Sequence, residues 1–276
     1  ADDAVGAEHI ASGSKLVTTD AQGNTVSGTN AGDSFSGTDA TNNTLIGYNA
    51  GTAITDGDNN TAFGSWALDE NTTGSNNTAV GKNALLANTT ASYNVAVGQA
   101  ALAANTTASD NTAVGYGSLK ENTTGNENVA VGKNALDANT TGGTNTALGA
   151  FGLGANTTGA SNTAVGQAAL HGNTTASNNT SVGYRSLFAN TTGTGLIGIG
   201  TNALDSNTTG NNNIGVGVNS LGVNTTGNKN VAVGRDALGA NTTADNNVAV
   251  GDQALLNNTT GAYNTALGYT ALDANT

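Results

Sequence analysis

Apolar and polar positions recur along this chain at one fixed interval. A short stretch such as Thr-Ala-Val or Val-Ala-Val ends in a Gly every 17 residues, from Gly47 to Gly268, without insertion or deletion. Leu follows that Gly by four residues in every unit except the first, and Asn-Thr-Thr begins three residues after the Leu. Strict repetition of a short unit within one chain is the signature of a solenoid.

The length of the unit favours β-structure, because 17 residues are too few for two helices of ordinary length. Thr, Val, Asn and Gly also suit short strands and turns. We expect two short strands in each coil, around Thr-Ala-Val and around Ala-Leu, joined by Asn/Thr/Gly corners. The predicted fold is therefore all-β, a parallel β-solenoid or β-roll of about fourteen 17-residue coils. Coils stacked at ~4.8 Å make a rod roughly 65 Å long.

The first forty residues do not follow the period. Segments 24–28 and 33–37 echo the motif at the wrong spacing, and Gly51 stands where Leu is expected. We therefore predict an N-terminal cap or attachment segment over residues 1–40 and the repeat solenoid over residues 41–276. The start at ADDAVG indicates a processed product or an excised segment. The stop within Asn-Thr-Thr indicates either a longer protein or an open end that docks against another copy.

Several repeated positions are predicted to be structural. The Gly after Val is never Ala, which indicates a positive φ or a close backbone approach. The site after Asn-Thr-Thr accepts Gly or Ala and therefore requires only small size.

Corner Asn side chains can bond their own coil and stack as an amide ladder. Asn-Thr-Thr also fits the glycosylation pattern, but glycans one coil apart would collide. The predicted structural ladder comprises Asn71, Asn88, Asn105, Asn122, Asn139, Asn156, Leu85, Leu102, Leu119, Leu136, Val80, Val97, Val131, Gly81, Gly98 and Gly132.

The apolar residues outnumber the places that one thin rod offers them. Neighbouring strand residues face opposite ways, so Ala and Val of one strand cannot both point inward. With about one Leu and one Val per coil inside, a second apolar row remains in water, and this favours a homotrimer. We expect Leu136→Asn or Val131→Asp to cost several kcal/mol, and Lys133→Ala less than about 0.5 kcal/mol.

Four stretches, 94–98, 128–132, 230–234 and 247–251, read Asn-Val-Ala-Val-Gly. They resemble the head repeats of trimeric autotransporter adhesins, which form a YadA-like left-handed parallel β-roll. The longer unit at 111–125 resembles repeats of phage tail fibres and related bacterial fibre proteins. The resemblance covers residues 41–276 and implies an all-β trimeric fibre at a cell or virion surface.

The composition disfavours several classes of binding partner and of catalytic or metal site. Seven Lys and Arg against nineteen Asp and Glu give a net charge of −12, which disfavours binding to nucleic acid or to an anionic membrane surface. The chain has no Cys and two His, and no apolar run long enough to span a membrane. Asp56 with Asp58, Asp69 with Glu70, and His171 are interpreted as solvated surface residues. We expect no enzyme activity, no cofactor, no metal and no membrane insertion.

The function expected from these observations is a structural or adhesive extracellular fibre, either a surface adhesin or a tail-fibre shaft, that presents a rigid rod. The expected location is extracellular, at a cell surface or virion. Expected partners are further copies of the chain, in a homotrimer or an end-to-end filament, and a cell-surface receptor or glycan. Two alternatives stay open: an ice-binding solenoid with Thr72/Thr73 rows, and a self-assembling end-to-end surface filament.

Overall fold

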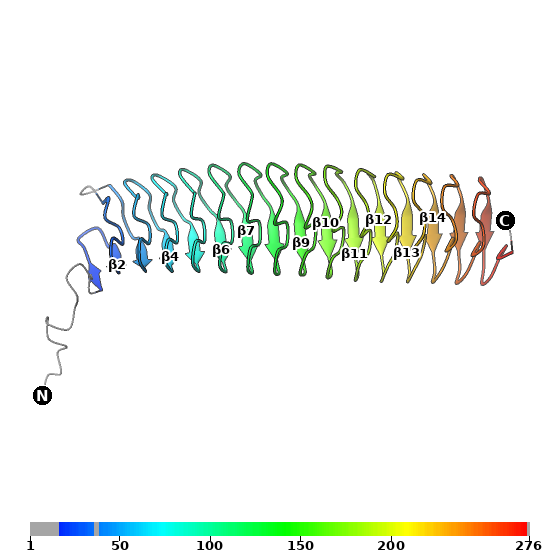
Figure 1. The fold of residues 1–276 in the computed structure, drawn as a ribbon, viewed down its shortest axis with the longest axis horizontal. Helices are drawn as coiled ribbons and strands as arrows, with labels where there is room; N and C mark the ends of the chain where they lie inside the picture. The colour runs from blue at the N-terminus through cyan, green and yellow to red at the C-terminus, as the bar shows by residue number, and fades with distance from the viewer. Residues whose placement is uncertain (1–16, 36–38, 275–276) are drawn as a thin grey trace, which may run out of the picture.

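The chain forms one long sheet of short strands, one strand per coil (Figure 1). The computed structural model describes residues 17–35 and 39–274, and these contain no helix, so none that could cross a membrane. Two strands precede the regular coils, β1 (Thr18–Thr19) and β2 (Thr25–Ser27). The regular strands are β3 (Thr44–Ile46), β4 (Thr61–Phe63), β5 (Thr78–Val80), β6 (Val95–Val97), β7 (Thr112–Val114), β8 (Val129–Val131), β9 (Thr146–Leu148), β10 (Thr163–Val165), β11 (Thr180–Val182), β12 (Ile197–Ile199), β13 (Ile214–Val216), β14 (Val231–Val233), β15 (Val248–Val250) and β16 (Thr265–Leu267).

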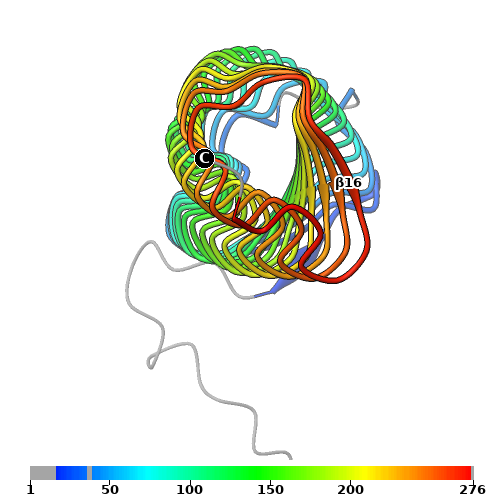
Figure 2. The same ribbon diagram turned by 90° about the vertical axis from the view of Figure 1, so that its right-hand side faces the viewer.

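Neighbouring strands from β2 to β16 are parallel and hydrogen-bonded in sequence order. From β3 onward each residue pairs with the residue 17 positions later, as Thr44 does with Thr61. The end-on view shows the coils stacked around a common axis, each displaced slightly from the one before (Figure 2). The predicted all-β parallel solenoid of about fourteen 17-residue coils is therefore confirmed.

The expectation of two strands per coil is wrong, because the Ala-Leu segment turns instead of extending. Leu136 has φ of 53°, and the corresponding Leu of the other coils has a similar positive φ. Backbone hydrogen bonds still join this segment to the next coil, as from Leu119 N–H to Ala135 O at 3.0 Å. A corner can therefore be stacked like a strand without having the extended conformation of one.

The interior takes the Ala at the centre of each strand and the Leu of the corner. Ala130 and Leu136 are both fully buried, whereas Val131 points outward with 38% of its surface exposed. The assignment of Val131 to the interior is therefore wrong, and the burial on which the several kcal/mol expected for Val131→Asp depended is absent in the single rod. The reason is space, because the corner Leu already fills the cross-section. A Cβ at Gly198, a strand-centre position, would lie 2.6 Å from Ser186 Oγ and 3.0 Å from Leu187 Cγ, both at the corner of the preceding coil.

The N-terminal region joins the same sheet. β2 pairs with β3 in parallel at an offset of 19 residues, Thr25 to Thr44, and β1 lies antiparallel along the other edge of β2. Asp20 closes the turn between β1 and β2 by accepting hydrogen bonds from the N–H groups of Gln22 and Asn24, at 3.0 and 2.8 Å. The sheet therefore begins inside the segment predicted as a cap. Residues 1–16 and 36–38 of that segment, and 275–276, lie outside the described residues.

Candidate functional site

The leucines of the predicted ladder line the interior of the rod. Leu85, Leu102, Leu119 and Leu136 are all fully buried, with φ between 49° and 53°. A left-handed backbone costs a residue with a Cβ roughly 1–2 kcal/mol, but burying a Leu side chain contributes about 1.5–3 kcal/mol. The corner conformation is therefore stabilised by the side chain that it turns inward.

The six predicted asparagines form one continuous amide ladder. Asn88 Nδ2 donates to Asn71 Oδ1 at 2.8 Å and to the backbone oxygen of Ala91 at 3.0 Å, so both amide hydrogens are used. Every Asn of this set is fully buried. The bonds from each Asn to the Asn one coil before it measure 2.8–3.0 Å for Asn105, Asn122, Asn139 and Asn156. Because the amide nitrogens are enclosed and paired, these Asn side chains hold the coils together and face no ligand.

A second ladder was not singled out from the sequence, although its Asn stands immediately before every strand from β2 to β16 except β12. Asn94 N–H donates to Asn77 Oδ1 at 3.0 Å, and Asn77 N–H donates to Asn60 Oδ1 at 2.9 Å. The ladder is interrupted at Leu196, whose N–H donates to Asn179 Oδ1 but whose side chain can accept nothing in return. The regular spacing of this Asn was the signal that could have revealed it.

The Gly that ends each strand motif has both a positive φ and a close backbone neighbour, the two alternatives predicted from its presence in every coil. Gly81, Gly98 and Gly132 have φ of 131°, 135° and 135°. A Cβ on Gly81 would lie 2.6 Å from the backbone oxygen of Gly98 in the next coil. The Gly/Ala site after Asn-Thr-Thr lacks positive φ, and Ala91 is accepted there in a buried position. Glycine is therefore required at the first site by conformation and contact, whereas the second site requires only a small residue, either Gly or Ala.

Val80 and Val97 are half-buried and Val131 is exposed, and all three belong to a row on the outer face of the sheet. We call this row the outer apolar column. It contains the third residue of every regular strand, and every one is apolar: Ile46, Phe63, Val80, Val97, Val114, Val131, Leu148, Val165, Val182, Ile199, Val216, Val233, Val250 and Leu267. Several of these side chains are more than a third exposed, Phe63 to 56%. The rod thus presents an apolar stripe along its whole repeat region.

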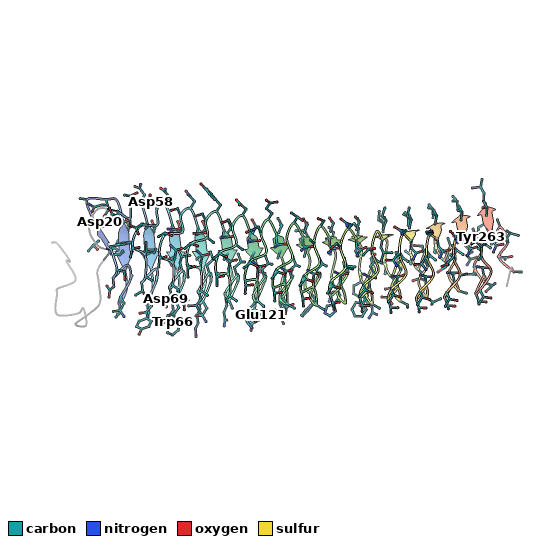
Figure 3. The ribbon with its side chains drawn as sticks, turned by 90° about the horizontal axis from the view of Figure 1, so that it is seen from above. Asp20, Asp58, Trp66, Asp69, Glu121 and Tyr263 are labelled. Atoms are coloured by element: carbon teal, nitrogen blue, oxygen red, sulfur yellow. The ribbon has the colours of Figure 1, made fainter. Side chains whose placement is uncertain are left out.

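The residues that vary between coils gather mainly on another side. We call it the variable flank, defined by residues 82–83 and 86–87 and by their equivalents at 17-residue spacing. Trp66, Asp69 and Glu121 project from one side of the rod and Asp58 from the opposite side (Figure 3). Trp66 lies edge-on to Tyr48 at 5.5 Å between ring centroids, and the Lys82 ammonium lies 5.3 Å from the Trp66 ring. Coils therefore differ in charge and shape along this flank, and they also differ at the two positions after the Gly/Ala site, as at Asp110 and Glu127.

The acidic and histidine candidates are dispersed. Asp58 accepts hydrogen bonds from the Thr41 N–H and hydroxyl at 2.7 and 2.8 Å, while His171 stacks on Phe188 at 5.4 Å. Burial raises the pKa of Asp137 against the opposing effect of nearby hydrogen bonds and of His171. Within residues 17–35 and 39–274, no three His, Asp or Glu side chains are grouped closely enough to hold a metal ion.

Comparison of the chain with protein-family models, with curated proteins and with solved structures finds no match. The resemblance to adhesin heads and tail fibres therefore rests on the repeat motifs alone. The expected absence of enzyme activity stays a prediction.

Proposed function

We propose that the chain is a structural or adhesive fibre protein of an extracellular surface, such as an adhesin or a tail-fibre shaft, and that it associates with copies of itself as a homotrimer. The observation that carries the proposal is the outer apolar column. Exposed apolar stripes of this kind mark interaction surfaces in soluble proteins. A stripe parallel to the rod axis is suited to a closed cyclic assembly of parallel rods.

The hydrogen bonding of the rest of the rod supports a mechanical role. A continuous strand ladder ties each coil to the next, and two asparagine ladders add hydrogen bonds between most neighbouring coils. Every buried side-chain nitrogen and oxygen of the described residues has a hydrogen-bond partner. Since each coil contacts only its neighbours, such a rod can be lengthened coil by coil without a larger globular core. The fixed interior and the variable flank fit a shaft that presents different surface groups along its length.

Native mass spectrometry and electron microscopy test the proposal. We expect an elongated particle with three times the chain mass of 26.8 kDa. Replacing Val131 and Val165 of the outer apolar column by Lys should shift the particle toward the mass of one chain, because the charges would be buried in the interface. Thr141 and Thr175, which lie the same distance apart on an exposed row, provide the control when replaced by Lys.

A wild-type particle with the mass of one chain, or equal dissociation by both pairs of substitutions, would contradict the trimer. Particles whose length grows with protein concentration would instead indicate an end-to-end filament.

Ice binding has one observation in its favour, an unbroken row of exposed threonines that begins at Thr73 and recurs in each coil to Thr260. The row is a single residue wide. The adjacent Thr72 is half-buried and donates its hydroxyl to the backbone oxygen of Thr89 at 3.1 Å, and this bond recurs in later coils. A flat array with two free hydroxyl rows is thus not formed at this corner. Thermal hysteresis in dilute solution tests this alternative.

A further inference from the structure

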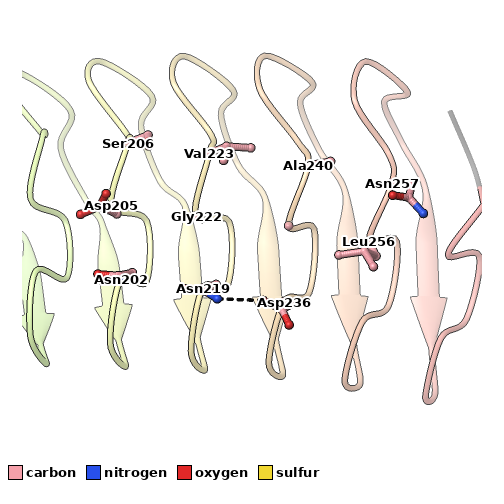
Figure 4. A pocket seen from close by; sticks show the side chains of 11 residues that line it. Asn202, Asp205, Ser206, Asn219, Gly222, Val223, Asp236, Ala240, Leu256 and Asn257 are labelled. Atoms are coloured by element: carbon pink, nitrogen blue, oxygen red, sulfur yellow. Dashed lines mark hydrogen bonds between the residues drawn. The ribbon is translucent and has the colours of Figure 1, made fainter.

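A groove of about 590 Å³ lies on the variable flank, across the four coils that begin with β12, β13, β14 and β15 (Figure 4). Gly222 and Gly239 form part of its wall. At the equivalent position other coils carry large side chains, including Leu86, Lys120 and Phe188. The groove therefore exists because two consecutive coils lack a side chain at this position.

The groove combines polar edges with apolar surface. Asn202, Asn219, Asp205 and Asp236 supply amide and carboxylate groups, and Leu256 supplies apolar surface beside the two glycines. Amide side chains both donate and accept hydrogen bonds, whereas carboxylates accept them. A few polar groups placed around apolar surface are typical of small-ligand sites, and the volume lies in their usual range.

The charges of the groove select against ionic ligands. Among the described residues that line it are two carboxylates and no Lys or Arg, so an anionic ligand would be repelled. A cationic ligand would find both carboxylates already paired. Asp205 lies 3.3 Å from Arg185, and Asp236 lies 3.4 Å from Arg235. Asp236 also accepts a hydrogen bond from Asn219 Nδ2 at 3.0 Å. The ligand that fits these groups is neutral and rich in hydroxyls.

We propose that this groove binds a neutral oligosaccharide that lies along the rod axis. Four coils stacked at ~4.8 Å give the groove a length of roughly 15 Å. The repeat of the coils is close to the length of one pyranose ring along a polysaccharide chain, so successive rings meet successive coils. Hydroxyls bond to the amides and carboxylates at the edge, while the C–H faces of the rings pack on Leu256 and Val223. The inference rests on the adhesive side of the proposed function and names its ligand class.

The test uses the whole chain and a panel of neutral trisaccharides to hexasaccharides of glucose, galactose, mannose and N-acetylglucosamine. Binding is measured by saturation-transfer NMR and calorimetry, with sialylated oligosaccharides and oligolysine as ionic probes. We expect at least one neutral oligosaccharide to bind. Filling the groove by Gly222→Leu should weaken its affinity at least about tenfold.

Gly154→Leu is the matched control, because Gly154 occupies the equivalent position outside the groove. A Cβ at Gly154 would lie 3.1 Å from His171 Cδ2, and one at Gly222 would lie 3.0 Å from the backbone oxygen of Asn219. Because Gly154 is buried under His171 and Gly222 is half-buried, melting curves verify that both variants fold. Asn219→Ala should also weaken binding, whereas Asn134→Ala, at the equivalent position elsewhere, should not. Ala occurs naturally at this position as Ala100, with the same positive φ.

Absence of binding by every neutral oligosaccharide at millimolar concentration would overturn the proposal. Equal effects of Gly222→Leu and Gly154→Leu, or tighter binding of the ionic probes, would do the same. The native mass of each variant is recorded in parallel. A single-chain mass with groove-dependent sugar binding refutes the trimer alone, and a trimer without sugar binding refutes the groove alone.

Discussion

The first regular coil and the coils in the middle of the rod fill the same interior in opposite ways. In the middle, Ala130 stands at the strand centre and Leu136 at the corner, whereas the first coil has Leu45 at the strand centre and Gly51 at the corner. All three apolar side chains are fully buried. A Cβ on Gly51 would lie 2.8 Å from Leu45 Cδ2. The large side chain thus enters from the strand in one coil and from the corner in the other.

The two coils show that the corner backbone does not depend on which residue carries the large interior side chain. The corner backbone is the same in both coils, with φ of 57° at Gly51 and 53° at Leu136. Stacking on the neighbouring coil therefore sets the backbone, and the strand centre and the corner together carry one large and one small side chain. In the first coil the fully buried Ile54, which stands where later coils have Asn, also lies 2.9 Å from a Cβ at Gly51. Close packing of the interior explains why both positions are not large at once.

The largest effect is expected from Leu136→Asn, which removes apolar volume from the interior and encloses an amide without a partner. We expect a loss of about 3–5 kcal/mol in the free energy of unfolding, measured by chemical denaturation. Leu86→Asn is the control, because Leu86 lies half-buried on the variable flank. Similar losses for the two variants would show that the interior is not where the structure places it.

A smaller net effect is expected when a middle coil is converted to the pattern of the first. Ala130→Leu alone should cost about 1–3 kcal/mol by overpacking, and Leu136→Gly alone about 2–5 kcal/mol by opening a cavity. The double variant should be more stable than the sum of these losses by at least about 1 kcal/mol, because the two sites share one space. If the stability loss of the double variant equalled the sum of the two single losses, the two side chains would not share one space.

A substitution on the variable flank should hardly change the free energy of unfolding. Lys133 is exposed, with its ammonium 5.7 Å from the Phe151 ring. We expect Lys133→Ala to change the free energy of unfolding by less than about 0.5 kcal/mol. A loss as large as that of Leu136→Asn, measured in the same denaturant series, would contradict the separation of interior and flank.

The smallest effect is expected in the pH dependence of folding stability, through Asp137, which follows the interior Leu136 in the chain. Burial raises the pKa of this carboxyl in the folded chain, so folding favours its protonated form. Its contribution to stability is therefore greatest at low pH, and falls as the pH rises through the folded-state pKa. Asp137→Asn should flatten this part of the stability profile between pH 3 and 7, measured by thermal unfolding relative to wild type. An unchanged profile would show that the carboxyl is fully solvated.

Much of the repeat architecture could be predicted from single columns of residues. The invariant Gly81 column indicated positive φ or close contact, and both are present. The inward direction of Val131 was predicted wrongly, because strand alternation allows either Ala or Val to face inside. The volume of the corner Leu decides whether Ala or Val faces the interior. The position of that Leu depends on a turn, whereas the sequence pattern had suggested a strand there.

The amino-acid sequence by itself determined the period, the parallel stacking of the coils and the columns of Gly, Leu and Asn, because a repeat of constant length brings equivalent residues into register. Only the tertiary structure decided which face of each strand is enclosed, how β1 and β2 begin the sheet, and where Gly222 and Gly239 leave a groove. These features depend on contacts between adjoining coils and across the interior, and neither set of contacts follows from the order of residues in one coil.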